Sequence, residues 1–174
     1  MFIMKKQFIL IIGLFFGVSL TLSGQNQDLA MYFQKMHGNW RADLETSDFS
    51  KTPAELLESE SQITPLPVGN GIQIRNMQKI KLPDGNIRDE VNVFIIAEGT
   101  EGNIQVLNLA DEGATYGTGQ FSGNGITFDP PDNPNIKSTD WKLYLDDSGA
   151  LRYDNYAVLA DGRKMGYTLV AGKE

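Results

Sequence analysis

Few residues in this chain have the types needed for catalysis. The sequence contains one histidine, His37, and no cysteine. This excludes a cysteine nucleophile and a histidine-rich zinc site, because thiolates and imidazoles supply those centres. A Ser-His-acid triad would have to use His37, and the sequence has no Gly-x-Ser-x-Gly turn of the kind that exposes a nucleophilic serine. The sequence therefore gives no signature of a catalytic site.

Carboxylates are plentiful, and oxygen-rich loops can hold Ca²⁺. Two acidic segments are candidates, Asp129–Asn133 around a Pro-Pro pair and the turn at Asp146-Asp147. Neither has the regularly spaced ligands of an EF-hand loop. We interpret both as solvated turns and expect no metal site.

The first two dozen residues have the pattern of a signal peptide. Lys5 and Lys6 precede an apolar run from Phe8 to Leu22, which is the length of a signal core and too short to span a bilayer comfortably. Small residues follow, so we expect cleavage close to Gln25. Without a cysteine at this junction a lipoprotein anchor is excluded. The prediction is an exported protein, periplasmic or secreted, with a signal peptide at 1–24 and one domain at 25–174.

The charge of the mature chain narrows the class of partner. Removing Lys5 and Lys6 leaves 13 basic residues against 22 acidic ones, a net charge of −9. Nucleic acids and anionic membranes are bound by positive surfaces, so we expect neither as a partner. A small-molecule ligand remains compatible with this charge.

The chain begins with a short helical pattern and continues with strand patterns. Leu29, Phe33 and Met36 lie at helical spacing in the segment Asn26–Met36. From Gly38 the hydrophobic period changes to two, as in half-buried antiparallel strands. A helix this short needs a docking surface, and the end of a barrel would provide one.

Ten predicted strands are separated by tight turns rich in Gly, Asp and Asn. They span residues 38–45, 55–64, 72–81, 87–97, 104–109, 114–121, 126–129, 141–145, 151–159 and 164–171. We predict a turn or loop at Phe49–Pro53 and an irregular connection at Pro130–Ser138. Consecutive strands without intervening helices favour an all-β fold, a single antiparallel up-and-down barrel of eight to ten strands with a short capping helix. A β-sandwich is the alternative.

The start of the first strand carries a Gly-x-Trp pattern, Gly38 and Trp40. In this position, after an amphipathic segment and before a series of strands, it resembles the lipocalin-like (calycin) barrels, and most of all their small secreted bacterial members of unassigned function. The resemblance implies that Trp40 plugs the barrel floor. It also implies that a basic residue near the last strands, Arg163, packs across this tryptophan, so that Gly38, Trp40 and Arg163 close the barrel.

The pattern is also similar to nitrobindin-like barrels, which hold haem through a histidine in a strand near the C-terminus. This sequence has no histidine after His37. Tyr153, Tyr156 and Tyr167 would be weak substitutes for that axial ligand. We expect no cofactor.

The barrel interior is the remaining candidate site. The residues that strand alternation could turn inward, and that suit an amphipathic ligand, are Arg75, Arg88, Phe94, Tyr144, Tyr153 and Tyr167. An inward Arg75 or Arg88 would anchor a carboxylate. Alternation does not fix the inner face where both faces are apolar, so these arginines could equally be surface residues beside acidic neighbours.

Three hypotheses follow for function. The first is an exported barrel that binds a small hydrophobic or amphipathic molecule non-covalently. The second is a filled barrel that serves as a structural or protein-interaction module, and the third is a barrel enzyme acting on a lipid-like substrate. An empty interior on the order of several hundred Å³ would favour the first over the second.

Overall fold

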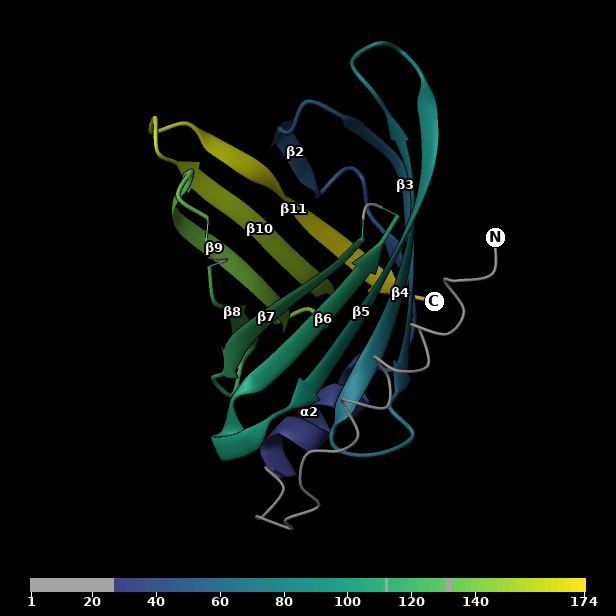
Figure 1. Cartoon of the computed structure of the whole chain (residues 1–174). Helices are drawn as coiled ribbons and strands as arrows, with labels where there is room; N and C mark the ends of the chain where they lie inside the picture. Colours follow the sequence, from purple (N-terminus) through teal and green to yellow (C-terminus); the bar gives the residue numbers. More distant parts are fainter. Residues whose placement is uncertain (1–26, 112, 131–132) are drawn as a thin grey trace, which may run out of the picture.

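The computed structural model describes residues 27–111, 113–130 and 133–174 (Figure 1). The predicted signal peptide at 1–24 and its cleavage site lie outside the described residues. So does Asp132 of the acidic segment 129–133.

The described chain contains a helix followed by strands and one 3₁₀ turn. The elements are α2 (Gln27–Met36), β1 (Gly38–Ala42), β2 (Asp48–Lys51), β3 (Glu55–Pro65), β4 (Gly71–Lys81), β5 (Ile87–Glu98), η1 (Thr100–Gly102), β6 (Ile104–Ala110), β7 (Gly113–Phe121), β8 (Ile126–Phe128), β9 (Ile136–Leu145), β10 (Leu151–Leu159) and β11 (Lys164–Lys173).

The strands form a closed antiparallel barrel. Each strand from β3 to β11 pairs with the next one, and β1 closes the ring by pairing with β3 on one edge and β11 on the other. Ten strands of the described chain make up this ring, and β2 pairs with the remaining part of β11. The predicted all-β barrel with a short helix before it is confirmed.

Several strand boundaries differ from the sequence prediction, for example β1, which ends at Ala42 and not at residue 45. Two of the differences involve a whole segment. The segment predicted as a turn or loop at Phe49–Pro53 contributes to β2, because its backbone pairs with β11 at Lys51 and Asp48. The connection predicted up to Ser138 ends earlier, since β9 begins at Ile136. In both cases the strand is defined by a distant partner rather than by local alternation.

Helix α2 lies across one end of the barrel, which we call the closed end (Figure 1). Its apolar stripe of Leu29, Phe33 and Met36 is buried, as the helical spacing predicts. Tyr32 fixes the helix further, because its hydroxyl accepts a hydrogen bond from Leu145 N at 3.0 Å and donates one to Asn124 O at 3.4 Å. Asn124 lies in the turn between β7 and β8, and Leu145 is the last residue of β9.

Trp40 joins the helix to the barrel wall. Its side chain is 2% exposed, and its Nε1 donates a hydrogen bond to Met36 O at 2.8 Å. The ammonium of Lys173 lies 5.4 Å from the centroid of its ring. The indole therefore fills the floor of the barrel and also satisfies a carbonyl at the C-terminal end of α2.

The Trp40 hydrogen bond can be tested with a matched pair of substitutions. Trp40→Phe is expected to lower the free energy of unfolding by about 2 kcal/mol, because it leaves the buried Met36 carbonyl unpaired and opens a small cavity. Trp141→Phe should cost about 1 kcal/mol less, since Trp141 Nε1 is buried without a partner. Urea unfolding measures both, and equal losses would contradict this role for the hydrogen bond.

Gly166 in β11 gives a second stability test. Its φ is +137°, and a Cβ built there would lie 1.9 Å from Asn155 O of the neighbouring strand. Gly166→Ala should therefore destabilise the protein by at least about 3 kcal/mol. Gly172→Ala is the control in the same strand, because its Cβ would meet no atom within 4 Å. A comparable loss in both variants would refute the steric explanation.

Candidate functional site

The barrel interior changes character from one end to the other. Beside α2 it is apolar, and strand register places a layer of aliphatic side chains there: Ile63, Ile72, Ile96, Ile104, Ile126 and Leu151. All of these are buried together with Trp40. This layer and the helix form a solid floor.

A polar layer lies farther from α2. Asn76 accepts hydrogen bonds at Oδ1 from Ser59 Oγ at 3.0 Å and from Ser61 Oγ at 3.2 Å. Asn92 is the cross-strand partner of Asn76, so its side chain lies on the same inner face. By the same register argument Asn108 and Asn155 also face inward. Uncharged amides and hydroxyls therefore line the middle of the barrel.

Aromatic rings occupy one side of the interior. Tyr153 packs edge-on against Phe128 and Tyr167, with centroid distances of 6.5 Å and 5.9 Å. Phe94 is tilted against Tyr153 at 6.5 Å. Tyr167 in turn stacks on Phe49 of β2 at 5.0 Å with an interplanar angle of 12°. The cluster reaches from the apolar floor to the end of the barrel opposite α2, which we call the open end.

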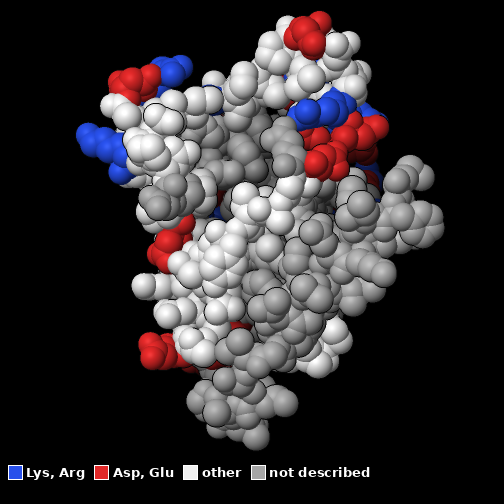
Figure 2. Space-filling model, in the orientation of Figure 1, with Lys and Arg blue, Asp and Glu red and all other residues white. Residues whose placement is uncertain are grey.

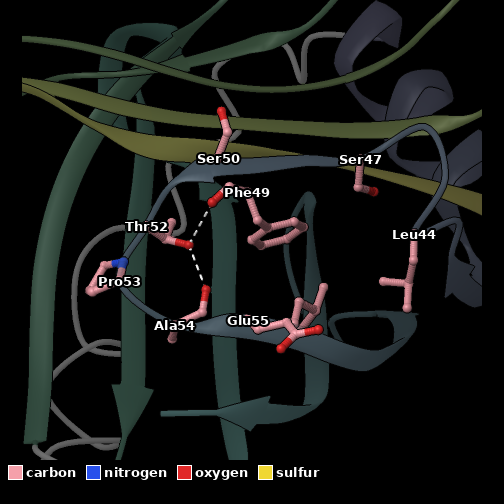
Figure 3. A pocket seen from close by; sticks show the side chains of 9 residues that line it. Leu44, Ser47, Phe49, Ser50, Thr52, Pro53, Ala54 and Glu55 are labelled. Atoms are coloured by element: carbon pink, nitrogen blue, oxygen red, sulfur yellow. Dashed lines mark hydrogen bonds between the residues drawn. The ribbon is translucent and has the colours of Figure 1, made fainter. Parts of the chain in front are cut away.

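The barrel wall is interrupted at the open end. In the described chain β2 pairs with β11, and no backbone pairing joins it to β3. Thr52 holds the connecting turn, because its hydroxyl donates to Phe49 O at 2.9 Å and to Ala54 O at 2.7 Å. Figure 3 shows the Phe49 ring pointing into the space between the two segments, while Ser50 points away. We call this space the β2–β3 seam.

Two cavities meet at this seam. The outer cavity has a volume of about 400 Å³ and is lined by Leu44, Ser47, Phe49, Ser50, Thr52, Pro53, Ala54, Glu55 and Leu56. The inner cavity has about 230 Å³ and is lined by Phe49, Thr52, Ala54, Leu56, Gln78, Ile80, Glu90, Asn92 and Tyr167. They share Phe49, Thr52, Ala54 and Leu56, so the two cavities lie next to each other at the seam.

The charged residues that line these cavities are acidic. Glu55 lines the outer cavity and Glu90 the inner one, whereas neither Lys nor Arg is among the described lining residues. Each carboxylate pairs with a half-exposed base that is not a lining residue, Glu55 with Lys81 at 3.1 Å and Glu90 with Arg88. Arg88 continues the inner face of β5 beyond Glu90, towards the start of the strand. Figure 2 shows charged side chains of both signs gathered towards the open end in that view.

Two polar atoms in the barrel are buried and unpaired. Asn108 Oδ1 is an acceptor and Trp141 Nε1 is a donor, and neither has a hydrogen-bond partner in the described structure. Strand register turns Asn108 and Trp141 to the inner face. An unpaired buried polar group costs about 1–3 kcal/mol, so these atoms are suited to bind water or a polar ligand group.

Burial alters the acidity of the inner tyrosines. Burial raises the pKa of Tyr153 far above its ordinary value, and the neighbouring Tyr167 adds to the rise. Burial also raises the pKa of Tyr167, a hydrogen bond with Asn155 opposes the rise, and the negative charge of Glu90 adds to it. Both hydroxyls are therefore neutral at physiological pH and can donate or accept hydrogen bonds.

The predicted ligand-binding residues divide between the two faces of the wall. Phe94, Tyr153 and Tyr167 lie inside the barrel. Arg75 is exposed on the outer face, because it alternates with the inward Ile74 and Asn76. Tyr144 is also outside, where the ammonium of Lys142 lies 4.8 Å from its ring. The structure thus does not bring Arg75 or Tyr144 to the cavities.

The other predicted residues lie at the ends of the barrel. Arg88 is half-exposed at the open end, paired with Glu90. Arg163 is 71% exposed in the β10–β11 turn and pairs with Asp161 at 2.7 Å. It is at the end of β11 opposite Trp40, so the cation packed on this tryptophan is Lys173 and not Arg163. Gly38 lies at the closed end with a φ of +131°, which a glycine tolerates best.

Two features of the site were not predicted from the sequence: the position of Phe49 at the seam and the polar layer in the middle of the barrel. Phe49 lies in the segment predicted as a turn, and its stacking on Tyr167 depends on a pairing with the distant β11. Asn76 and Gln78 share their face with the isoleucines of β4, which was visible in the alternation. Polar residues on a core-facing side are a usable signal of a polar interior.

The sequence matches no protein-family model, and no curated protein matches it. Among the described residues, none of the helices has the length and apolar character to cross a bilayer. Clusters of three or more potential metal-ligating His, Cys, Asp or Glu side chains are also absent from that part of the chain. The geometry of the site is therefore the basis for assigning its function.

The tyrosine burial predicts a pH dependence of stability. Because the folded pKa of Tyr153 and Tyr167 exceeds the unfolded value, their contribution is complete below about pH 10 and is lost as the pH rises above it. The free energy of unfolding, measured by urea denaturation at intervals from about pH 9 to about pH 11, should fall steadily. Tyr153→Phe should make this fall less steep, and an unchanged slope would contradict the assignment.

Proposed function

We propose that this protein is an exported, lipocalin-like barrel that binds a small hydrophobic or amphipathic molecule non-covalently. The site is the inner cavity together with the β2–β3 seam. Export and the lipocalin-like resemblance rest on the N-terminal sequence and on the Gly38-x-Trp40 pattern. The binding proposal rests on the geometry of the open end.

The observation that carries the proposal is the pair of neighbouring cavities on either side of the β2–β3 seam, which share four lining residues. The outer cavity, with about 400 Å³, is within the range of small-molecule pockets, about 300–1,000 Å³, and the inner one, with about 230 Å³, is just below it. Phe49, Leu56, Ile80 and Tyr167 offer apolar surface to a ligand's hydrocarbon part. Gln78 and Asn92 offer hydrogen bonds to its polar part.

The packing of the closed end supports ligand binding at the open end. Trp40, the isoleucine layer and α2 fill that end with buried side chains, so a ligand has access from the open end or the seam. A site that is apolar, concave and equipped with a few polar groups is typical of non-covalent small-molecule binding.

The filled-barrel interaction module remains a second candidate because of two observations. The rings around Tyr153 occupy much of the middle of the barrel. On the outer face, the cross-strand partners Met77 and Val91 are exposed by 37% and 40%, and an exposed apolar patch can contact another protein.

Native mass spectrometry tests the two candidates. The chain is expressed with its N-terminal segment, recovered from the periplasm without detergent, and measured before and after organic extraction. A reproducible adduct of small-molecule mass that extraction removes supports ligand binding. A bare mass, persisting after incubation with fatty acids, alkylamines and retinoids, would refute it and favour the interaction module.

A substitution at the seam locates the binding. Ala54 lines both cavities, so Ala54→Phe should fill part of both and reduce the binding of an uncharged naphthylamine fluorophore about tenfold or more. The control Ala114→Phe adds the same ring to an exposed position of β7. Fluorescence titration measures both, and equal affinity in the two variants would place the binding elsewhere.

A further inference from the structure

We propose that the inner cavity selects a ligand with a cationic head group, an alkylammonium or similar organic amine, which Glu90 binds at the barrel mouth. This inference rests on the proposed ligand-binding function and specifies its substrate class. It differs from the sequence-based expectation of a carboxylate held by Arg75 or Arg88.

The charged side chains that line the cavities are carboxylates. Glu55 and Glu90 line them, and the described lining residues include neither Lys nor Arg. Arg75 lies on the outer face, so it cannot neutralise a ligand carboxylate inside. The bases that pair with Glu55 and Glu90 are half-exposed and do not line the cavities. A carboxylate that lines a concave site favours a cation over an anion there.

Glu90 lies on the inner face of β5, where the inner cavity meets solvent. It is the cross-strand partner of Gln78 on β4 and shares the inner face of β5 with Asn92. All three side chains line the inner cavity with Tyr167. The Glu90 side chain is 24% exposed, so its carboxylate lies at the boundary between solvent and cavity. An ammonium bound there would keep its hydrocarbon chain in the apolar part.

Glu90 already makes an ion pair with Arg88. Arg88 belongs to the same strand two residues earlier, and its side chain is 51% exposed. Exposed ion pairs contribute little to stability, because solvent screens the attraction and the side chains lose freedom. Arg88 can therefore turn to solvent, or remain beside one carboxylate oxygen while a ligand ammonium contacts the other.

Two aromatic side chains form part of the lining of the inner cavity. Phe49 and Tyr167 stack with centroids 5.0 Å apart, and both line the inner cavity. Aromatic faces attract organic cations through their quadrupole. Glu90, the aromatic rings and the uncharged amides can therefore bind a protonated amine. An anion would find no positively charged partner among the described lining residues.

The test compares three probes with the same chain: octylammonium, octanol and octanoate. Isothermal titration calorimetry at neutral pH and low salt measures their affinity for the protein recovered from the periplasm. Octylammonium is expected to bind about tenfold more tightly than octanol, the magnitude of one charge-assisted interaction, and octanoate more weakly than octanol. The advantage of octylammonium should shrink at high salt.

Matched variants assign the effect to one carboxylate. Glu90→Gln should reduce the octylammonium affinity about tenfold and leave octanol unchanged. Glu58→Gln is the control, because Glu58 also pairs with a base, Lys79 at 3.4 Å, but lies on the outer face of β3. The retained octanol affinity of Glu90→Gln shows that the variant is folded.

The outcomes separate the two proposals. Binding of octanol and octanoate as tight as that of octylammonium, or an octylammonium affinity unaffected by Glu90→Gln, would overturn the cation selectivity and leave the ligand-binding function intact. Failure of all three probes to bind the inner cavity would overturn the binding function itself.

Discussion

The barrel depends on how one short segment, residues 38–51 with β1 and β2, pairs along the edge of the last strand, β11. β1 pairs with the C-terminal part of β11 and also with β3, so it closes the ring and leaves no free edge at the closed end. β2 covers the N-terminal part of β11 but has no partner on its other side. The same segment therefore seals one end of the barrel and leaves a seam at the other, and the seam is where both cavities lie.

The two ends divide stability from binding. At the closed end Trp40 and α2 bury apolar surface, and the indole hydrogen bond ties the helix to the floor. At the open end the interior becomes polar through Asn76 and Asn92, and the acidic Glu90 lies at the mouth. A gradient from an apolar floor to a polar mouth suits a molecule with one apolar and one polar end, because each part meets a matching environment.

Much of the fold could be predicted from the sequence, because strand alternation and Gly/Asp turns are local signals. The helix stripe at Leu29, Phe33 and Met36 is an example. The misplaced features depend on partners distant in sequence. β2 is a strand only through β11, and the cation on Trp40 is Lys173 because β1 pairs with the end of β11. The inner faces of β4, β5 and β9 also needed the strand register, which explains why Arg75 and Tyr144 were candidates and Glu90 was not.

The pairing of β1 with β11 also has a consequence for how the chain reaches its folded state. Trp40 pairs with Lys173, so the closing contact joins the two ends of the folded sequence. Such non-local contacts form slowly, because most of the chain must be ordered before they do. Synthesis must deliver the final strand before the ring can close. Until then β1 and β10 each have an open edge, and this interval is when the protein is most exposed to aggregation and to proteases.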